Sequence, residues 1–424
     1  MAEEAGAQAQ GQAKPAGPPP EVQARIDRTV AWASERFSAY YERAELHMPV
    51  RLGKREWGFM WLGKHFVVRH TSFRSEPDLR SYLVREGPAH VYYSTAYYEN
   101  PRADAMKDKG WLGADLIFDL DADHIEAAKD KGFEDMLKLI QREAVKLAHD
   151  FLLGDLGFRP DQLRVVFSGG RGYHLHVQAP EVFSLGSAER REIVDYVEGV
   201  GLDLERVLGE RVVHVSERAG KRKREKRTEA SGGSPGWAGR IVRGELELLE
   251  ELRNLEPKEA RARTKAWGLS DDKARELLSF LHSEAVDSEG RTFRERFLAT
   301  GHLPKGHALD KALRMEALQK MALAAKGGEA DEPVTSDIKR LIRLPGSVHG
   351  KTALRVVPVP LERLESFDPL REAVAFGDEP VTLDVSKPEK VRLKGKEWDL
   401  QPGRQELPEH VALFVALRRK ALLV

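Results

Sequence analysis

The chain has 424 residues, with 68 Lys and Arg against 68 Asp and Glu, and 41% of its residues are hydrophobic. This length suits a catalytic core with an inserted or appended subdomain, and the composition is globular rather than disordered. No apolar run approaches the about 18 residues of a membrane-spanning helix, and the first residues lack the pattern of a secretory signal, so we expect no membrane attachment. The absence of cysteine excludes disulfides, Cys-ligated zinc, iron–sulfur clusters and thiol nucleophiles in this chain, and it indicates a cytosolic protein.

Residues 1–20 consist mainly of Ala, Gly, Gln and Pro, and we predict that they form a disordered tail. Apolar residues then recur at helical spacing from Val22 to Tyr41. Runs rich in aromatic and β-branched residues predict the next three strands, at 56–62, 65–73 and 90–98.

The middle of the chain alternates between the two kinds of pattern. Residues 114–123, ADLIFDLDAD, form an apolar run suited to a buried strand, and residues 133–153 return to helical spacing. Two further strands are predicted at 163–170 and 173–179, with three glycines turning the chain between them. Strand, helix and strand with short connections predict the α/β class.

The second half has a different character. Helical patterns dominate residues 187–325, apart from a segment at 221–237 that is basic and then rich in Gly, Ser and Pro, which predicts a loop. The predicted parts are a disordered tail at 1–20, a discontinuous core at 21–184 and 326–405, a mainly helical insertion at 185–325 and a C-terminal helix at 406–424.

Two carboxylates stand two residues apart in the predicted strand at 114–123. Residues i and i+2 of a strand share a face, so Asp119 and Asp121 project side by side from an apolar segment. Two like charges held together favour a neutralising cation, and Mg²⁺ or Mn²⁺ takes such oxygen ligands. The motif is short, and for an isolated pair of this kind a solvated Asp pair at a strand end is the more common explanation. Asp123 is a weaker ligand candidate, and Asp115 is interpreted as a solvated strand start.

A glycine-rich turn follows at 168–174, with the sequence SGGRGYH. Closely spaced glycines allow backbone N–H groups to approach an anion, and Ser168, Arg171 and His174 add side-chain donors. His176 shares a face with His174 if the strand is regular. The alternative is a glycine-rich hairpin with a satisfied histidine.

The third cluster lies at 331–351, DEPVTSDIKRLIRLPGSVHGK. It gathers Arg340, Arg343, His349 and Lys351 around a Pro-Gly turn, with acidic residues before it. Such a basic turn beside carboxylates suits a triphosphate next to a metal, and it equally suits a solvated loop.

In combination these elements resemble the catalytic (small) subunit of the archaeal and eukaryotic type of DNA primase. The resemblance spans about residues 30 to 360 and rests on REWGF (55–59), VVRHTSF (67–73), YYSTAYYENP (92–101), GWLGADLIFDLDADHI (110–125), VVFSGGRGYHLHV (165–177) and DEPVTSDIKRLIRLPGSVHGKTAL (331–354).

The resemblance implies an archaeo-eukaryotic primase fold, with a two-layer α/β catalytic core related to RNA-recognition-motif sheets. It implies synthesis of short primers on single-stranded DNA from nucleoside triphosphates, with two Mg²⁺ or Mn²⁺ ions. The implied catalytic metal ligands are Asp119, Asp121 and Asp331, the last because it stands eighteen residues before His349. The implied nucleotide-binding residues are Arg69, Ser168, Gly169, Arg171, His174, Arg343, His349 and Lys351. Arg55 and Glu56 match an element near the nucleotide site.

The resemblance also implies a heterodimer with a primase large subunit that carries an iron–sulfur cluster, acting in the cytoplasm on the nucleoid. Family members usually carry a zinc site with cysteines after the paired aspartates. Here residues 124–136, HIEAAKDKGFEDM, contain no cysteine, so we expect no Cys-ligated zinc.

Two other functions share these motifs. One is a stand-alone primase-polymerase in repair or mobile-element replication, which would extend primers without starting them. The other is an inactivated subunit that binds nucleotide or template. Seven of the ten residues at 218–227 are basic; this run either contacts a template backbone or is a solvated loop.

Overall fold

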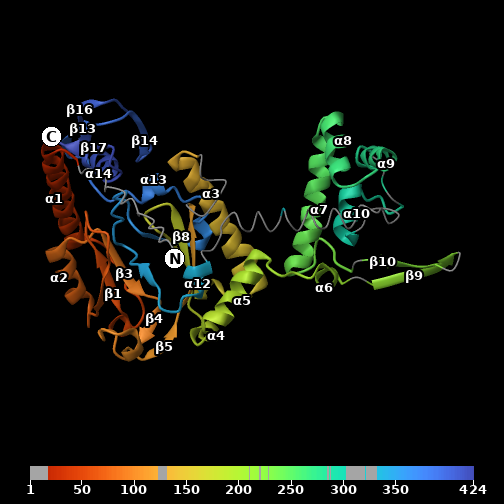
Figure 1. Cartoon of the computed structure of the whole chain (residues 1–424), viewed down its shortest axis with the longest axis horizontal. Helices are drawn as coiled ribbons and strands as arrows, with labels where there is room; N and C mark the ends of the chain where they lie inside the picture. Colours follow the sequence, from red (N-terminus) through yellow and green to blue (C-terminus); the bar gives the residue numbers. More distant parts are fainter. Residues whose placement is uncertain are drawn as a thin grey trace, which may run out of the picture.

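The computed structural model describes residues 18–122, 131–209, 211–218, 221–227, 229–283, 286, 288–301, 320 and 332–424, with 211–218, 221–227 and 332 described by their backbone alone. It is a mixed α/β protein whose two larger sheets lie at one end and whose helical part lies at the other (Figure 1). Residues 1–17 of the predicted tail lie outside the described residues. Helix α1 (Pro20–Arg43) starts within the predicted tail, with proline in the first turn, where its missing N–H costs nothing.

The first sheet is antiparallel and has the order β11-β3-β1-β2. Its strands are β1 (Trp57–Met60), β2 (Val68–Thr71), β3 (His90–Ser94) and β11 (Leu341–Arg343). The apolar side chains of β1 and β3 pack with those of α1 and of α2 (Glu76–Glu86). The pairing of β11 with β3 brings the basic cluster of the C-terminal third beside a strand formed some 250 residues earlier, with Arg343 opposite Tyr92.

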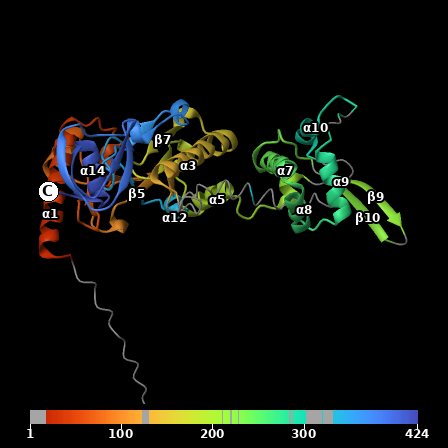
Figure 2. The same ribbon diagram turned by 90° about the horizontal axis from the view of Figure 1, so that it is seen from above.

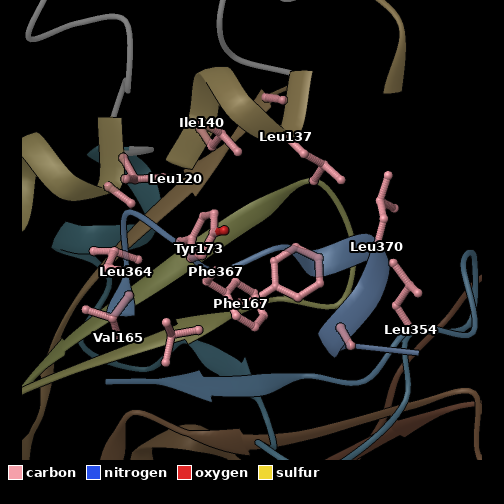
Figure 3. Packing of buried hydrophobic residues seen from close by; sticks show 14 of the residues in the cluster. Leu120, Leu137, Ile140, Val165, Phe167, Tyr173, Leu354, Leu364, Phe367 and Leu370 are labelled. Carbon is pink, nitrogen blue, oxygen red and sulfur yellow. The ribbon is translucent and has the colours of Figure 1, made fainter. Parts of the chain in front are cut away.

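The second sheet is also antiparallel, with the order β12-β7-β8-β6. Its strands are β6 (Leu116–Asp121), β7 (Leu163–Phe167), β8 (Gly172–Val177) and β12 (Val357–Val359). Alternate residues of β6 and β8 pack against α3 (Phe133–Lys146), which continues as a π-helical stretch (Leu147–Asp155). Figure 3 shows this core, with Leu120 and Tyr173 of the sheet close to Ile140 of the helix. The opposite side of the sheet carries the buried Ile117, followed by Asp119 and Asp121, on β6, and His174 and His176 on β8.

Smaller strands complete the core. Strands β4 (Ala96–Tyr98) and β5 (Trp111–Ala114) form a pair. The C-terminal part contains α13 (Pro369–Glu372), β13 (Pro380–Val385), β14 (Glu389–Leu393), β15 (Lys396–Leu400), β16 (Gly403–Pro408), α14 (Glu409–Leu417) and β17 (Ala421–Leu423). The predicted C-terminal helix at 406–424 is therefore wrong in extent. The helix ends at Leu417 because the next residues pair as a strand with β13.

The helical part has its own apolar core, to which Ile241, Leu249, Leu277 and Phe297 contribute. It follows α4 (Pro180–Phe183) and contains α5 (Ser187–Glu198), α6 (Leu204–Leu208), α7 (Gly236–Asn254), α8 (Pro257–Ala266), α9 (Asp271–Leu281) and α10 (Phe293–Thr300). The last part of the segment predicted as mainly helical, residues 302–325, lies outside the described residues apart from residue 320.

The predicted loop at 221–237 is wrong in its first half. Residues Lys221–Arg227 form strand β10, which pairs with β9 (Arg211–Arg218) in a hairpin. Figures 1 and 2 show this hairpin extending outward from the helical part, away from the sheets. Among the described residues no helix combines the length and apolarity needed to cross a membrane.

Candidate active site

Asp119 and Asp121 lie on β6, on the side of the strand opposite its buried leucines. The strand period of two fixes this arrangement, because Leu116, Phe118 and Leu120 take the apolar side. Both aspartates are partly exposed. The pairing of β6 with β8 places Asp119 opposite His174 and Asp121 opposite Gly172. A Cβ at position 172 would lie 2.0 Å from the carbonyl oxygen of Leu120, so only glycine allows β8 to begin beside this carboxylate.

His174 is buried and its Nε2 lies 3.5 Å from Oδ1 of Asp119. Its Nδ1 has no hydrogen-bond partner within the described part of the chain, so Nε2 is the nitrogen positioned to donate toward the carboxylate. Burial, followed by the nearby His176 and Arg343, holds the pKa of His174 well below its usual range. The predicted shared face of the two histidines is confirmed by the register of β8, with ring centroids 6.3 Å apart.

The glycine-rich turn and the distant His349 pack directly on one another. A Cβ at Gly170 would lie 2.9 Å from Nε2 of His349, and the hydroxyl of Thr352 donates to the carbonyl of Gly169 over 2.5 Å. Ser168 Oγ accepts the N–H of Gly170 at 3.3 Å, so one donor of the predicted anion nest is used within the turn. Gly169 and Gly170 therefore make room for the imidazole of His349, besides leaving backbone N–H groups of the turn open to an anion.

His349 presents an N–H group toward this turn. Its Nδ1 accepts a hydrogen bond from the backbone N–H of Lys351 at 3.3 Å, which leaves Nε2 to carry the proton of the neutral ring. Burial lowers the pKa of His349, and the neighbouring Arg343, His90, Lys351 and Arg171 lower it further. These groups, predicted separately from two motifs, are thus neighbours. The side chain of Lys351 is exposed.

One member of this cluster was not predicted from the sequence. His90, at the start of β3, accepts a hydrogen bond at Nδ1 from Nη1 of Arg343 at 2.6 Å. Its ring centroid lies 5.0 Å from that of His349, and the Arg343 guanidinium lies 4.9 Å from the ring centroid of Tyr92. Burial, then Arg343 and Lys351, lowers the pKa of His90 to about 2. A lone histidine in an otherwise apolar strand was the signal in the sequence.

Arg69 is held by a buried carboxylate. Glu56 is fully buried and accepts from Nε and Nη2 of Arg69 at 3.1 and 3.0 Å, and from the backbone N–H of His70 at 3.1 Å. Nη2 of Arg69 also lies 3.4 Å from the carbonyl of Lys339, just before β11. Glu56 therefore orients Arg69, whose side chain is about one third exposed.

The interpretation of Asp115 as a solvated strand start is wrong. Asp115 is 5% exposed, and its Oδ2 lies 2.7 Å from Nη2 of the fully buried Arg55. The hydroxyl of Tyr97 donates to the other carboxylate oxygen at 2.8 Å. Arg55 also donates to the carbonyl oxygens of Ser94 and Thr95. Because its guanidinium is enclosed, Arg55 supports the strands behind the site instead of reaching a ligand.

The remaining predicted metal ligand, Asp331, and the weaker candidate Asp123 lie outside the described residues. Helix α12 (Glu332–Ser336) begins one residue after Asp331 and packs against β6. Among the residues that the structure describes, no group of three His, Asp or Glu side chains is arranged to hold a metal ion. The described part of the site therefore consists of a carboxylate pair facing a cluster of neutral histidines and cations.

The buried histidines predict a pH dependence of stability. A histidine whose pKa in the fold lies below its value of about 6.5 in the unfolded chain takes up a proton on unfolding in acid. Such a histidine contributes its full share to the free energy of unfolding at a pH above about 6.5. That share falls as the pH drops below this value, by up to about 1.4 kcal/mol per pH unit for each such histidine. Denaturant unfolding between pH 7 and 5 measures this slope.

His90→Asn is expected to reduce that slope, because the asparagine oxygen can still accept from Arg343 but does not titrate. His65→Asn, at an exposed position, is the matched control. Equal slopes for the two variants would contradict a neutral His90 in the fold.

Comparison with known proteins gives the family of the chain. The family model described as DNA primase small subunit matches residues 118–361. The chain is 40% identical over 398 residues to the DNA primase small subunit PriS of Methanococcoides burtonii, covering 93% of this chain and 98% of that protein. The chain belongs to the DNA primase small subunit family. The family resemblance predicted from the motifs is confirmed.

Other primase small subunits give the same result. The protein named DNA primase small subunit PriS of Methanocella arvoryzae is 40% identical over 410 residues, with 93% of this chain and 98% of that protein covered. The protein of the same name from Archaeoglobus fulgidus is 37% identical over 396 residues, again with 93% and 98% covered. The matched span includes the carboxylate pair, the glycine-rich turn at 168–174 and the basic cluster at 331–351, whereas Arg69 and His90 precede it.

Proposed function

We propose that this primase small subunit is the catalytic subunit of DNA primase, a DNA-directed nucleotidyltransferase that makes short primers on single-stranded template from nucleoside triphosphates. The observation that carries the proposal is the register of β6 with β8, which places Asp119 beside His174. Close by, His349 packs on the glycine-rich turn. Carboxylates beside a group of cations and N–H donors suit nucleotidyl transfer.

We propose that Asp119, Asp121 and Asp331 hold two Mg²⁺ or Mn²⁺ ions. The shared face of the first two supports this assignment, as does the packing of α12, which directly follows Asp331, against β6. Carboxylate oxygens are the ligands that these hard cations prefer, and the chain has no cysteine for zinc. When bound, such ions lower the pKa of an attacking 3′-hydroxyl and neutralise the pyrophosphate leaving group.

The residues around the carboxylates would bind and orient the triphosphate. His349 presents Nε2–H beside the glycine-rich turn, and Arg343 is held in place by His90 and Tyr92. Neutral histidines donate single hydrogen bonds, while the arginines add charge and bidentate contacts. The proposed triphosphate residues are Arg69, Ser168, Gly169, Arg171, His174, Arg343, His349 and Lys351. Together they would position the α-phosphate for in-line attack.

We propose that a two-layer core related to RNA-recognition-motif sheets comprises 21–184 and 326–405, with 185–325 as an insertion. The separate apolar core of α7, α8, α9 and α10 supports the insertion. A primase large subunit is the expected partner, since the relatives are named small subunits. We propose that the pair acts in the cytoplasm on the nucleoid.

Priming of an unprimed single-stranded template tests the function. The purified chain is expected to make new oligonucleotides from nucleoside triphosphates with Mg²⁺ or Mn²⁺, to lose this activity with a chelator, and to regain it when either ion is restored. Assays with ribo- and deoxynucleotides in parallel give the sugar preference.

Extension of a supplied primer without new starts, even after a large subunit is added, would favour the stand-alone primase-polymerase. Template or nucleotide binding without any metal-dependent turnover would favour a non-catalytic subunit.

A further inference from the structure

The hairpin of β9 and β10 projects from the helical part of the molecule. The two strands pair from Lys221 opposite Arg218 to Arg227 opposite Arg211, with a bulge between Glu225 and Lys226. Figures 1 and 2 both show it at the end of the molecule farthest from the two larger sheets. No third strand joins it among the described residues. The hairpin is therefore not part of a larger sheet in the described structure. An isolated two-stranded ribbon has little stability of its own, so this element needs another explanation.

The hairpin concentrates positive charge. Residues 211–227 contain eight Lys or Arg and two Glu, a net charge of +6, whereas the net charge of the whole chain is zero. The remaining residues therefore carry a net charge of −6, and the overall neutrality of the chain conceals a strongly cationic projection. Such a local field attracts polyanions and accelerates their association.

The register places basic residues on both faces of the ribbon. Lys221 and Lys223 occupy one face of β10, and Arg222 and Arg224 occupy the other. Basic residues stand directly opposite each other at both ends of the hairpin, Lys221 opposite Arg218 and Arg227 opposite Arg211. Such pairs of like charge destabilise the hairpin in the absence of a counter-charge. β10 contains no apolar residue. The apolar residues of the two paired strands are the three valines of β9. β10 therefore fits an anionic ligand better than the centre of a protein interface, which would need apolar or aromatic residues.

We propose that the two strands of this basic hairpin, Arg211–Arg218 and Lys221–Arg227, bind the sugar–phosphate backbone of the template strand. The proposal rests on the proposed function, which makes single-stranded DNA the relevant polyanion. A strand of seven residues is about 24 Å long, enough to follow several successive phosphates. Asp119 lies on β6, in the same sheet as β8, and the hairpin lies at the opposite end of the molecule from that sheet (Figure 1). It would therefore hold template away from the reacting atoms and would affect template affinity more than the chemical step.

The test is binding of the full chain to a fluorescently labelled single-stranded oligothymidylate, followed by anisotropy over a range of salt concentrations. The hairpin variant replaces Lys221, Lys223 and Arg224 by Gln. The control variant replaces Lys258, Arg261 and Lys265, which are exposed on α8, also by Gln. Both variants remove three positive charges from the helical part.

For the hairpin variant we expect about 10- to 100-fold weaker binding at moderate salt and a salt slope smaller by about 2, because each phosphate contact on a single strand contributes about 0.7. A second variant, with Lys221→Arg and Lys223→Arg, keeps the charge and is expected to bind as the unmodified chain does. Equal affinities and slopes for the hairpin and control variants would overturn the proposal.

Binding and turnover are measured separately, so failure of this inference differs from failure of the proposed function. Loss of oligothymidylate binding in the hairpin variant supports the proposed binding site even if the purified protein, with or without the substitutions, makes no primers. Unchanged oligothymidylate binding together with loss of large-subunit binding would show that the hairpin is a protein interface, and would overturn the proposal.

Discussion

Asp119→Ala is expected to lower primer synthesis by about a thousandfold or more without unfolding the protein. A catalytic metal contributes several kcal/mol to transition-state stabilisation, and each about 1.4 kcal/mol corresponds to a factor of ten in rate. The side chain of Asp119 is partly exposed and lies opposite the apolar side of β6, so its truncation opens no cavity in the core. Incorporation of labelled nucleotide on single-stranded template measures the loss.

Asp161→Ala is the matched control, because Asp161 is an exposed aspartate outside the site that pairs only locally with Arg159. It is expected to act as the unmodified chain does. Asp121→Ala is expected to behave like Asp119→Ala, since both carboxylates project from the same face of β6. Near-normal incorporation by Asp119→Ala would remove this residue from the metal site.

Asp115→Ala is expected to destabilise the fold by about 3–5 kcal/mol, the usual cost of leaving a buried charge without its partner. The fully buried guanidinium of Arg55 would lose its carboxylate partner at 2.7 Å, and the hydroxyl of Tyr97 would lose its acceptor. The free energy of unfolding in denaturant measures the effect.

The double variant Arg55→Met with Asp115→Leu separates loss of the pair from loss of volume. Replacing both charges by apolar side chains of similar size is expected to recover much of the stability, because no unpaired charge remains buried. Arg55→Met alone is expected to cost about as much as Asp115→Ala. A cost below about 1 kcal/mol for either single variant would be typical of a solvated ion pair and would contradict the buried one.

Local patterns were sufficient for the central strands. The alternation of β6 predicted the shared face of Asp119 and Asp121 from the period of a strand, and the same rule placed His174 beside His176. The motifs also identified the family before any tertiary contact was known. These predictions succeeded because each depends on residues close together in the chain, where backbone geometry leaves few alternatives.

The basic hairpin shows where such patterns fail. Lys and Arg have no strong preference for strands, and residues 221–227 lack the apolar alternation that marks a half-buried strand. β10 is a strand because β9 pairs with it. The end of the chain was misassigned for a similar reason, since residues 421–423 become a strand through pairing with β13.

The amino-acid sequence was enough to establish the family, the carboxylate pair and the glycine-rich turn. The tertiary structure was needed to show that Asp115 is buried, that His90 belongs to the cluster and that the glycines accommodate His349. The difference is one of contact range. Arg343 and His90 are 253 residues apart, and His349 packs on a turn that lies far earlier in the chain. The burial and protonation of the two histidines therefore depend on how β11 and the following turn pack against the first sheet and the glycine-rich turn.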